Sequence, residues 1–276
     1  MAYALVALGF VLALNASGAV NFAHGDLVVL GGAVAVLLGA WLGLPGIALL
    51  PLVALALAVA GVLAARVAIV PLAGRPPEAT FVATIALAAI IEHGLTVGMG
   101  AAPHTAPPLA GAGAVEILGL PLGRQPLAIV VVGGILVAAI WFLLERTQTG
   151  RRMRAVASDR HMARAVGIPV ARYVVLSLAL AGALAGVAGL LLGHQFLVSP
   201  TQGAGHMLKA YIAVALGGWG SVPGALLAAL GIGVFECFVS AAVGDASASA
   251  ALYLGVLAVL VLRPQGLFGE PAGRRA

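Results

Sequence analysis

Nine apolar runs make up most of the sequence, and they limit the fold more strongly than any motif in it. Most of them approach the length of about 20 residues that an α-helix needs to cross a bilayer. Only 8% of the residues are charged, against about a quarter in soluble domains, so a water-facing surface could not cover these runs. We therefore predict an all-α polytopic membrane bundle with eight or nine transmembrane or re-entrant helices. The runs are Ala2–Val20, Leu27–Leu44, Ile47–Val67, Thr80–Met99, Leu127–Leu144, Tyr173–Leu192, Met207–Gly217, Ala225–Val243 and Ala248–Leu262.

Two features leave the helix count and the packing open. Met207–Gly217 is short for a full crossing and is either a spanning, a re-entrant or a broken helix. Glycines four residues apart let helix backbones approach closely in lipid, and here they serve either ordinary packing or a specific dimer face. The pairs are Gly94 and Gly98, Gly182 and Gly186, and Gly189 and Gly193.

The basic residues predict the orientation in the membrane. Residues 145–172 hold seven of the 14 basic residues. Two more lie at the loop 68–79, one just before it and one within it, and three lie in the C-terminal tail. Basic residues accumulate on the cytoplasmic side of short loops. We therefore expect these three segments in the cytoplasm and Gly100–Pro126 outside, whereas the side of the N-terminus depends on whether Met207–Gly217 spans. The basic residues of the other two segments are Arg66 and Arg75, and Arg263, Arg274 and Arg275.

The loop 145–172 contains a predicted amphipathic helix. The segment Arg154–Val166 has neither Gly nor Pro, and Gly167 followed by Pro169 is a typical helix end. The helical period predicts that Met162, Ala163 and Val166 share one face. The loop either sets only the topology or presents a close docking surface for another protein, because several of its residues are small. These are Ala155, Ala157, Ala163 and Gly167.

A polar break follows the first apolar run. The stretch Asn21-Phe22-Ala23-His24-Gly25 places an amide, an imidazole and a glycine between two helices. Non-helical backbone at membrane depth needs protein or a water-filled path around it, and half-helix ends can meet the charged groups of an amino acid. The alternative is that Asn21 and His24 cap a helix that starts near Asp26.

Ionisable residues inside a membrane are functional candidates, because each costs ~2.5–3.5 kcal/mol to insert. Glu92 and His93 fall deep in an apolar run, where we expect both to face the interior. Lys209 either extends to the interface or pairs with Glu236 across the bundle. Together with the polar break, these residues predict a substrate pathway lined by Asn21, Phe22, His24, Gly25, Glu92 and Lys209.

Four motifs occur in order along almost the whole chain. They are Asn21-Phe22-Ala23-His24-Gly25-Asp26, the loop pattern Arg154-Ala155-x-Ala157-x-Asp159-x-x-Met162-Ala163-x-x-x-Gly167-Ile168, the segment from Lys209-Ala210 to Pro223-Gly224-Ala225, and Arg263-Pro264-Gln265-Gly266-Leu267-Phe268-Gly269. In these motifs the sequence resembles the branched-chain amino-acid permeases of bacterial ABC importers. Such permeases usually begin one to two dozen residues earlier, so we expect this start to be trimmed or misannotated.

The resemblance implies a single transmembrane permease domain over residues 1–276 in the bacterial inner membrane. It implies a second permease as partner, in a heterodimer or a homodimer, two cytoplasmic ATPase subunits, an extracytoplasmic binding protein, and no cofactor. The implied substrates are leucine, isoleucine and valine, although similar permeases carry urea or short amides. It also implies that loop 145–172 holds the helix coupled to the ATPase, through Arg154, Ala155, Asp159, Met162, Ala163 and Gly167.

Enzymatic functions fit the sequence poorly. It has no G-x-x-x-x-G-K-[ST] phosphate loop, no H-E-x-x-H or G-x-S-x-G motif, and no clustered metal ligands. We therefore expect a transporter subunit whose ATP is hydrolysed elsewhere. A self-sufficient carrier or channel, which would need no docking helix, and a membrane enzyme or assembly factor, which would need a polar catalytic cluster, are the alternatives.

Overall fold

The computed structural model describes residues 1–111, 113–117 and 120–268. Each of the nine predicted apolar runs forms a helix, which confirms the predicted all-α membrane bundle. Two polar helices, α6 (Gln148–Ser158) and α7 (Arg160–Ala165), lie in the loop between the fifth and sixth runs. The apolar helices are α1 (Ala2–Ser17), α2 (His24–Leu42), α3 (Gly46–Ala64), α4 (Pro77–Met99), α5 (Arg124–Arg146), α8 (Val170–Gln195), α9 (Gly203–Gly217), α10 (Val222–Val243) and α11 (Asp245–Leu262).

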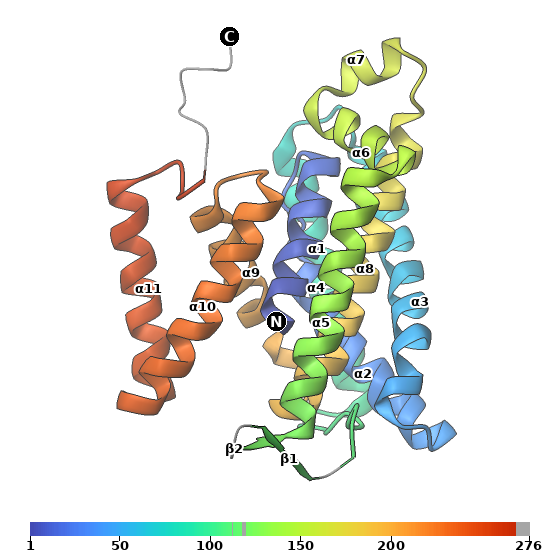
Figure 1. Cartoon of the computed structure of the whole chain (residues 1–276). Helices are drawn as coiled ribbons and strands as arrows, with labels where there is room; N and C mark the ends of the chain where they lie inside the picture. The colour runs from blue at the N-terminus through green and yellow to red at the C-terminus, as the bar shows by residue number, and fades with distance from the viewer. Residues whose placement is uncertain (112, 118–119, 269–276) are drawn as a thin grey trace.

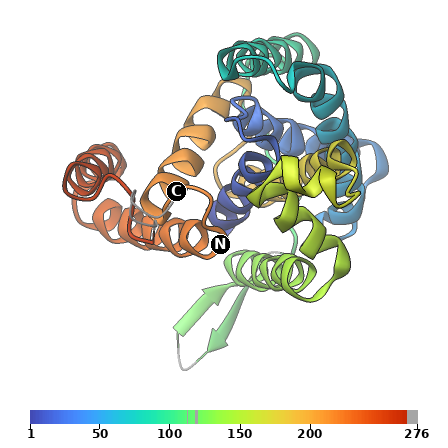
Figure 2. The same ribbon diagram turned by 90° about the horizontal axis from the view of Figure 1, so that it is seen from above.

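The apolar helices alternate in direction, so their connections fall at two ends of the bundle (Figure 1). Six are long and apolar enough to cross a membrane: α2, α3 with its continuation to Leu72, α4, α5, α8 and α10. Helices α1 and α11 are shorter apolar helices, and α9 has 15 residues. Seen from above, α10 and α11 lie to one side of the bundle, where α11 packs on α10 and α9 (Figure 2).

Helix α8 is the centre of the bundle, and its glycines allow α2 and α3 to pack closely against it. A side chain at Gly182 would collide with the carbonyl oxygen of Leu57 in α3, and one at Gly189 with that of Val28 in α2. Because these positions touch backbone, the glycine spacing in α8 serves packing within this chain. Gly94 and Gly98 of α4 differ, because nothing lies within 4 Å of either Cβ position.

At the lower end in Figure 1, the predicted outer segment contains the only strands among the described residues. Strands β1 (Ala114–Ile117) and β2 (Leu120–Gly123) form an antiparallel hairpin that the all-helical prediction did not include. His104 and Val198 exchange two backbone hydrogen bonds of 2.9 and 2.7 Å. These bonds tie the segment before the hairpin to the connection between α8 and α9.

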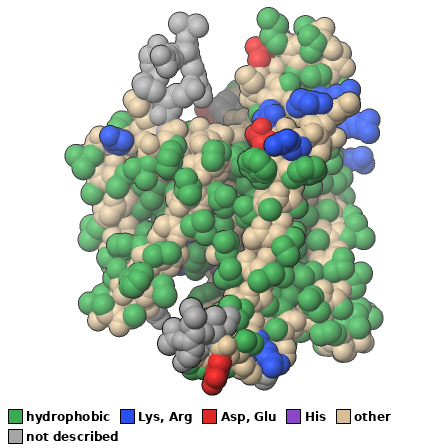
Figure 3. All heavy atoms as spheres, in the orientation of Figure 1, with side chains coloured by type: hydrophobic (Ala, Val, Ile, Leu, Met, Phe, Trp, Pro, Cys, Tyr) green, Lys and Arg blue, Asp and Glu red, His purple; other side chains and the backbone are tan. Residues whose placement is uncertain are grey.

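The opposite end, which we call the arginine end, is formed by α6, α7, the turn after α3 and the turn after α9. Arg160 of α7 bonds to Ala16 at the end of α1, and Asn15 of α1 bonds to Gly220 after α9. Figure 3 shows most of the visible Lys and Arg side chains gathered over this end, a few charged side chains at the lower end, and mainly apolar side chains between the two ends. The two predicted inner loops, 68–79 and 145–172, therefore lie at one end of the bundle together with Arg263, whereas Arg274 and Arg275 lie outside the described residues.

Helix α3 reaches the arginine end through irregular turns. A π-helical turn, Ala65–Ile69, and a 3₁₀ turn, Val70–Leu72, follow its last α-helical residue. Pro76 and Pro77 then start α4, as expected for proline just before and inside a helix start.

Candidate functional site

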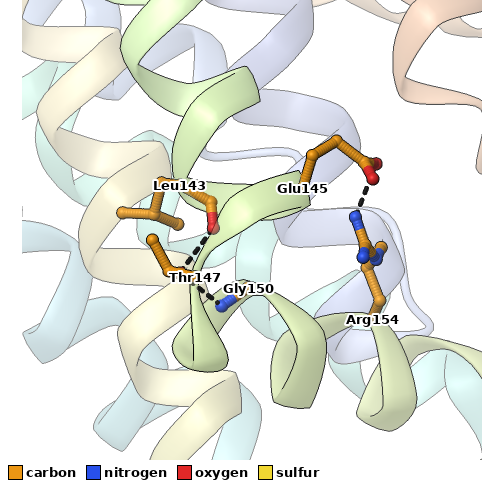
Figure 4. Close-up of polar contacts among 5 residues, drawn as sticks. All are labelled: Leu143, Glu145, Thr147, Gly150 and Arg154. Carbon is orange, nitrogen blue, oxygen red and sulfur yellow. Dashed lines mark hydrogen bonds and ion pairs between the residues drawn. The ribbon is translucent and has the colours of Figure 1, made fainter.

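The first candidate site begins where α5 turns into α6 (Figure 4). Thr147 is the N-cap of α6: its Oγ1 accepts a hydrogen bond from Gly150 N at 3.0 Å and donates one to Leu143 O at 2.6 Å. Gly150 leaves no space for a side chain, because a Cβ there would collide with the carbonyl oxygen of Leu143. Glu145 and Arg154 form a half-exposed ion pair across the turn at 2.5 Å. The cap, the glycine and the ion pair fix the angle at which α6 leaves α5.

The predicted single helix over Arg154–Val166 is wrong, because Asp159 divides it into α6 and α7. Asp159 has extended backbone, with φ −150° and ψ 110°, and its carboxylate accepts hydrogen bonds from His161 N at 2.7 Å and Met162 N at 3.0 Å. Aspartate competes with a continuing helix through such bonds and is a favoured N-cap. The aspartate therefore ends one helix and starts the next.

The predicted end of α7 is confirmed. Gly167 has φ +78°, Gly167 N donates to Arg164 O, and Ile168 N donates to Ala163 O at 2.9 Å. This is the Schellman pattern, in which glycine takes the left-handed position at low cost. Pro169 then becomes the N-cap of α8.

The predicted shared face of α7 is wrong. Ala163 is buried at 3% exposure, whereas Met162 is 67% and Val166 75% exposed. Ala163 therefore packs inside the chain, and the outer surface is the pair Met162 and Val166, one helical turn apart, which we call the α7 ridge. Of the other residues expected at the coupling surface, Ala155 is half-buried, and Arg154, Asp159 and Gly167 are exposed.

Arg160 holds α7 against the bundle. Its Nη2 donates a 2.7 Å hydrogen bond to the carbonyl of Ala16 in the last turn of α1, where helix carbonyls lack partners and favour a positive charge. Burial, and secondarily the charge of Arg164, lower the pKa of Arg160 from its usual value. This hydrogen bond links α7 directly to the end of α1.

The second candidate site is the α2 junction, formed by residues 21–26 and the start of α9. His24 bonds to Val6, which lies 11 residues before the end of α1 at Ser17, or about 16 Å at 1.5 Å per residue. Helix α2 therefore begins inside the bundle, well below the arginine end. A helix start at that depth places free backbone N–H groups in the interior.

Neither polar residue caps α2, so that alternative is wrong. The N-cap is Ala23, without a side-chain bond. His24 is fully buried, and its Nε2 lies 3.0 Å from the carbonyl of Val6. A carbonyl can only accept, so Nε2 is the donor, and Nδ1 of the neutral ring is an acceptor with no partner. Asn21 Oδ1 accepts from Ala23 N at 3.2 Å, while its Nδ2 donor also lacks a partner among the described residues.

Two helix starts meet at the junction. A Cβ on Gly25 would collide with the carbonyl oxygen of Gly203, the first residue of α9, and would lie 2.8 Å from Met207. Asp26, 5% exposed, lies against Gly203 and within the electrostatic influence of Glu92. The junction thus combines two positive helix ends with two carboxylates.

Helix α4 forms the other wall of the junction. The rings of Phe22 and Phe81 meet edge to face with centroids 4.4 Å apart, and Phe22 N donates to Thr84 Oγ1 at 3.2 Å. Glu92 is half-buried. His93 is exposed, so the prediction that it faces the interior beside Glu92 is wrong. Thr84 was missed as a site residue, although a hydroxyl in an apolar run was a visible signal.

The space beside the junction is closed in this conformation. A pocket of about 10 Å³ between α2, α8 and residues 197–206 is bordered by Gln202 and His206, two residues that sequence reasoning also missed. This volume is at the lower limit for one water molecule. A solute larger than a water molecule does not fit this pocket.

Of the two alternatives for Lys209, extension to the membrane interface or pairing with Glu236, the structure shows the pair. Its ammonium lies 2.8 and 3.0 Å from the two carboxylate oxygens and 3.0 Å from the hydroxyl of Tyr3, which gives all three N–H donors a partner. These contacts join α9, α10 and α1. Among the described residues, no three His, Cys, Asp or Glu side chains are grouped to hold a metal ion.

The sequence is similar to a family of transport permeases and to several of its curated members. Residues 1–262 match the family described as the permease component of branched-chain amino acid transport systems. The high-affinity branched-chain amino acid transport system permease protein BraD of Pseudomonas aeruginosa is 29% identical over 98% of this chain and 92% of its own length. The corresponding protein LivH of Escherichia coli is 28% identical with the same coverage. The ribose import permease protein RbsC of Escherichia coli is 30% identical over 83% of this chain and 72% of its own length. No solved structure matches the chain.

Proposed function

This chain belongs to the family of permease components of branched-chain amino acid transport systems, and from that premise we propose what it carries, with which partners and through which surfaces. It is a multi-pass membrane protein and the permease subunit of an ABC importer, a class that works with ATPase subunits and a binding protein. We propose that two ATPase subunits bind at the arginine end, that a second permease chain completes the complex, and that the binding protein docks at the opposite end.

The observation that carries the proposal is the α6–α7 pair at the arginine end. The α7 ridge presents two large apolar side chains to solvent, and Arg154 on α6 is exposed as well. Exposed apolar side chains on an otherwise basic surface are expected where another protein docks. Arg160 connects the ridge to α1, which packs on α2 and α8, so force applied by an ATPase at α7 has a direct route to the α2 junction.

Branched-chain amino acids are the proposed substrates. Both relatives that match this chain over nearly its whole length are named for them, whereas the ribose permease matches less of it. The junction supports the same choice: helix starts suit a carboxylate, and Asp26 with Glu92 suits an ammonium group, which ribose lacks.

We propose that Asn21, Phe22, His24 and Gly25, with Glu92, line the route when the junction opens. Two hydrogen-bonding groups there, Asn21 Nδ2 and His24 Nδ1, are buried without a partner in the part of the chain that the structure describes, and buried polar groups are usually satisfied. One can donate to a carboxylate and the other can accept from an ammonium group. Lys209 acts differently in this proposal, as the residue that fixes α9 to α10.

The ATPase surface is tested by changing the ridge. We expect Met162→Asp with Val166→Asp to leave the permease inserted but to remove substrate-stimulated ATP hydrolysis in proteoliposomes, because charge replaces the apolar contact. Met162→Leu, which keeps the surface apolar, serves as the control. Normal stimulation in the double aspartate variant would mean that the α6–α7 pair sets only topology.

The junction is tested by His24→Gln. The glutamine amide reaches the position of Nε2 and can keep the bond to Val6, while the ring Nδ1 is lost. We expect the complex to assemble normally and uptake per assembled complex to fall. Ser177→Ala, a buried polar change in α8 outside the junction, is the control and should transport normally. Unchanged uptake in His24→Gln would make His24 a purely structural link between α1 and α2.

A further inference from the structure

A cavity of about 210 Å³ opens at the arginine end, between the end of α1, the turn after α3, α7 and the start of α8. A water molecule occupies about 30 Å³ in the liquid, so the cavity has room for a considerably larger group. Three arginines line it, Arg75, Arg160 and Arg164, and the lining described by the structure includes no Asp or Glu. We call this the arginine cavity.

The charge of the arginine cavity is uncompensated. Arg160 uses one of its five N–H donors on Ala16 O. The side chains of Arg75 and Arg164 make no hydrogen bond or ion pair within the described residues. Arg160 and Arg164 lie one helical turn apart and repel each other. An enclosed space with like charges and no counter-charge attracts an anion.

Thr80 adds a free hydroxyl group to the lining of the arginine cavity. It lines the cavity and is only 6% exposed. Its hydroxyl has no hydrogen-bond partner among the described residues, although nearby Thr84 of the same helix is fully bonded. The hydroxyl oxygen is not among the buried unpartnered atoms, so it is open to the cavity, and a hydroxyl beside guanidinium groups is suited to an oxyanion.

Apart from Ser17, whose hydroxyl bonds to backbone carbonyls of its own segment, the remaining side chains of the lining are apolar. Ile69 and Val70, in the irregular turns that end α3, form one wall. Leu63, in the last turn of α3, is 57% exposed, and Val67, in the same π-helical turn as Ile69, is 72% exposed. An anion-binding cavity that opens beside exposed apolar helix surface suits a ligand with a charged head and hydrocarbon chains. We propose that the arginine cavity binds the phosphate headgroup of an anionic phospholipid whose chains lie along α3.

The proposal is tested by counting bound lipid. The purified complex is placed in nanodiscs of phosphatidylcholine containing phosphatidylglycerol, and retained phosphatidylglycerol is measured by native mass spectrometry. We expect Arg75→Gln and Arg164→Gln each to weaken phosphatidylglycerol binding about fivefold, and Thr80→Val to weaken it as well. The controls are Arg66→Gln and Arg172→Gln, which remove exposed arginines outside the cavity and should leave binding unchanged.

Three results would overturn the proposal. Equal losses in the cavity and control variants would show nonspecific attraction to surface charge. Binding of inorganic phosphate to lipid-free complex, with no selective retention of phosphatidylglycerol, would show a site for a free anion. Unchanged lipid retention together with loss of ATPase subunits in Arg164→Gln would assign the arginines to the protein partner. In contrast, failure of added inorganic phosphate to displace phosphatidylglycerol supports the lipid.

Discussion

The Lys209–Glu236 pair makes a quantitative prediction about charges inside the bundle. The ammonium satisfies all three donors at 2.8 to 3.0 Å, and the side chains are 21% and 15% exposed. Removing one partner of a fully buried pair costs about 3–5 kcal/mol, because the other charge is left alone. An unpaired charge within a membrane costs a similar ~2.5–3.5 kcal/mol. Because this pair keeps some exposure, we expect Lys209→Met alone, or Glu236→Gln alone, to lower the free energy of unfolding by about 2–3 kcal/mol.

The double variant should behave differently from the sum of its parts. With both charges removed, neither is left unpaired, so we expect the free energy of unfolding to fall by less than about 1 kcal/mol. The measurement is a double-mutant cycle on the detergent-solubilised permease complex, unfolded by a denaturing detergent. We also expect the double variant to keep its uptake per assembled complex, because the proposed role of Lys209 is to hold α9. Additive losses of stability would refute the pairing, and lost uptake in a stable double variant would place Lys209 on the route itself.

Two further predictions concern the coupling loop and the orientation. We expect Gly150→Ala to destabilise the complex by about 1–3 kcal/mol, since its Cβ collides with backbone. Gly134→Ala, in open space on α5, should be neutral or stabilising; equal thermal stability of the two variants would contradict the packing. After replacement of Cys237, a cysteine at Arg152 should be protected from an impermeant thiol reagent in intact cells and one at Gly111 should be labelled. Labelling from outside at Arg152 would reverse the orientation.

The helices could be predicted because their cause is local. A span needs about 20 apolar residues wherever it lies, and each run carries that information in its own composition. The end of α7 was equally local, because Gly167 and Pro169 act through their own backbone preferences. The break at Asp159 was also visible, as a strong N-cap after Ser158, but the uninterrupted helix formers around it favoured one helix.

The faces and the junction could not be predicted, because contacts distant in sequence decide them. Periodicity places Ala163 and Val166 near each other, but the bond from Arg160 to α1 determines which side of α7 turns inward. Nothing near His24 in sequence indicates a bond to Val6 rather than a cap. Lys209 and Glu236 could be suggested as a pair only because two opposite charges in an apolar bundle are costly apart.

Uptake by the reconstituted complex tests the central claim most directly. Proteoliposomes containing this permease with its copurified subunits would be loaded with ATP, and uptake of radiolabelled leucine would be measured with the binding protein outside. We predict uptake that needs internal ATP, the ATPase subunits and the binding protein together, and that unlabelled isoleucine and valine reduce. Leucine uptake by the permease alone, without ATP or ATPase, would instead show a self-sufficient carrier and contradict the account.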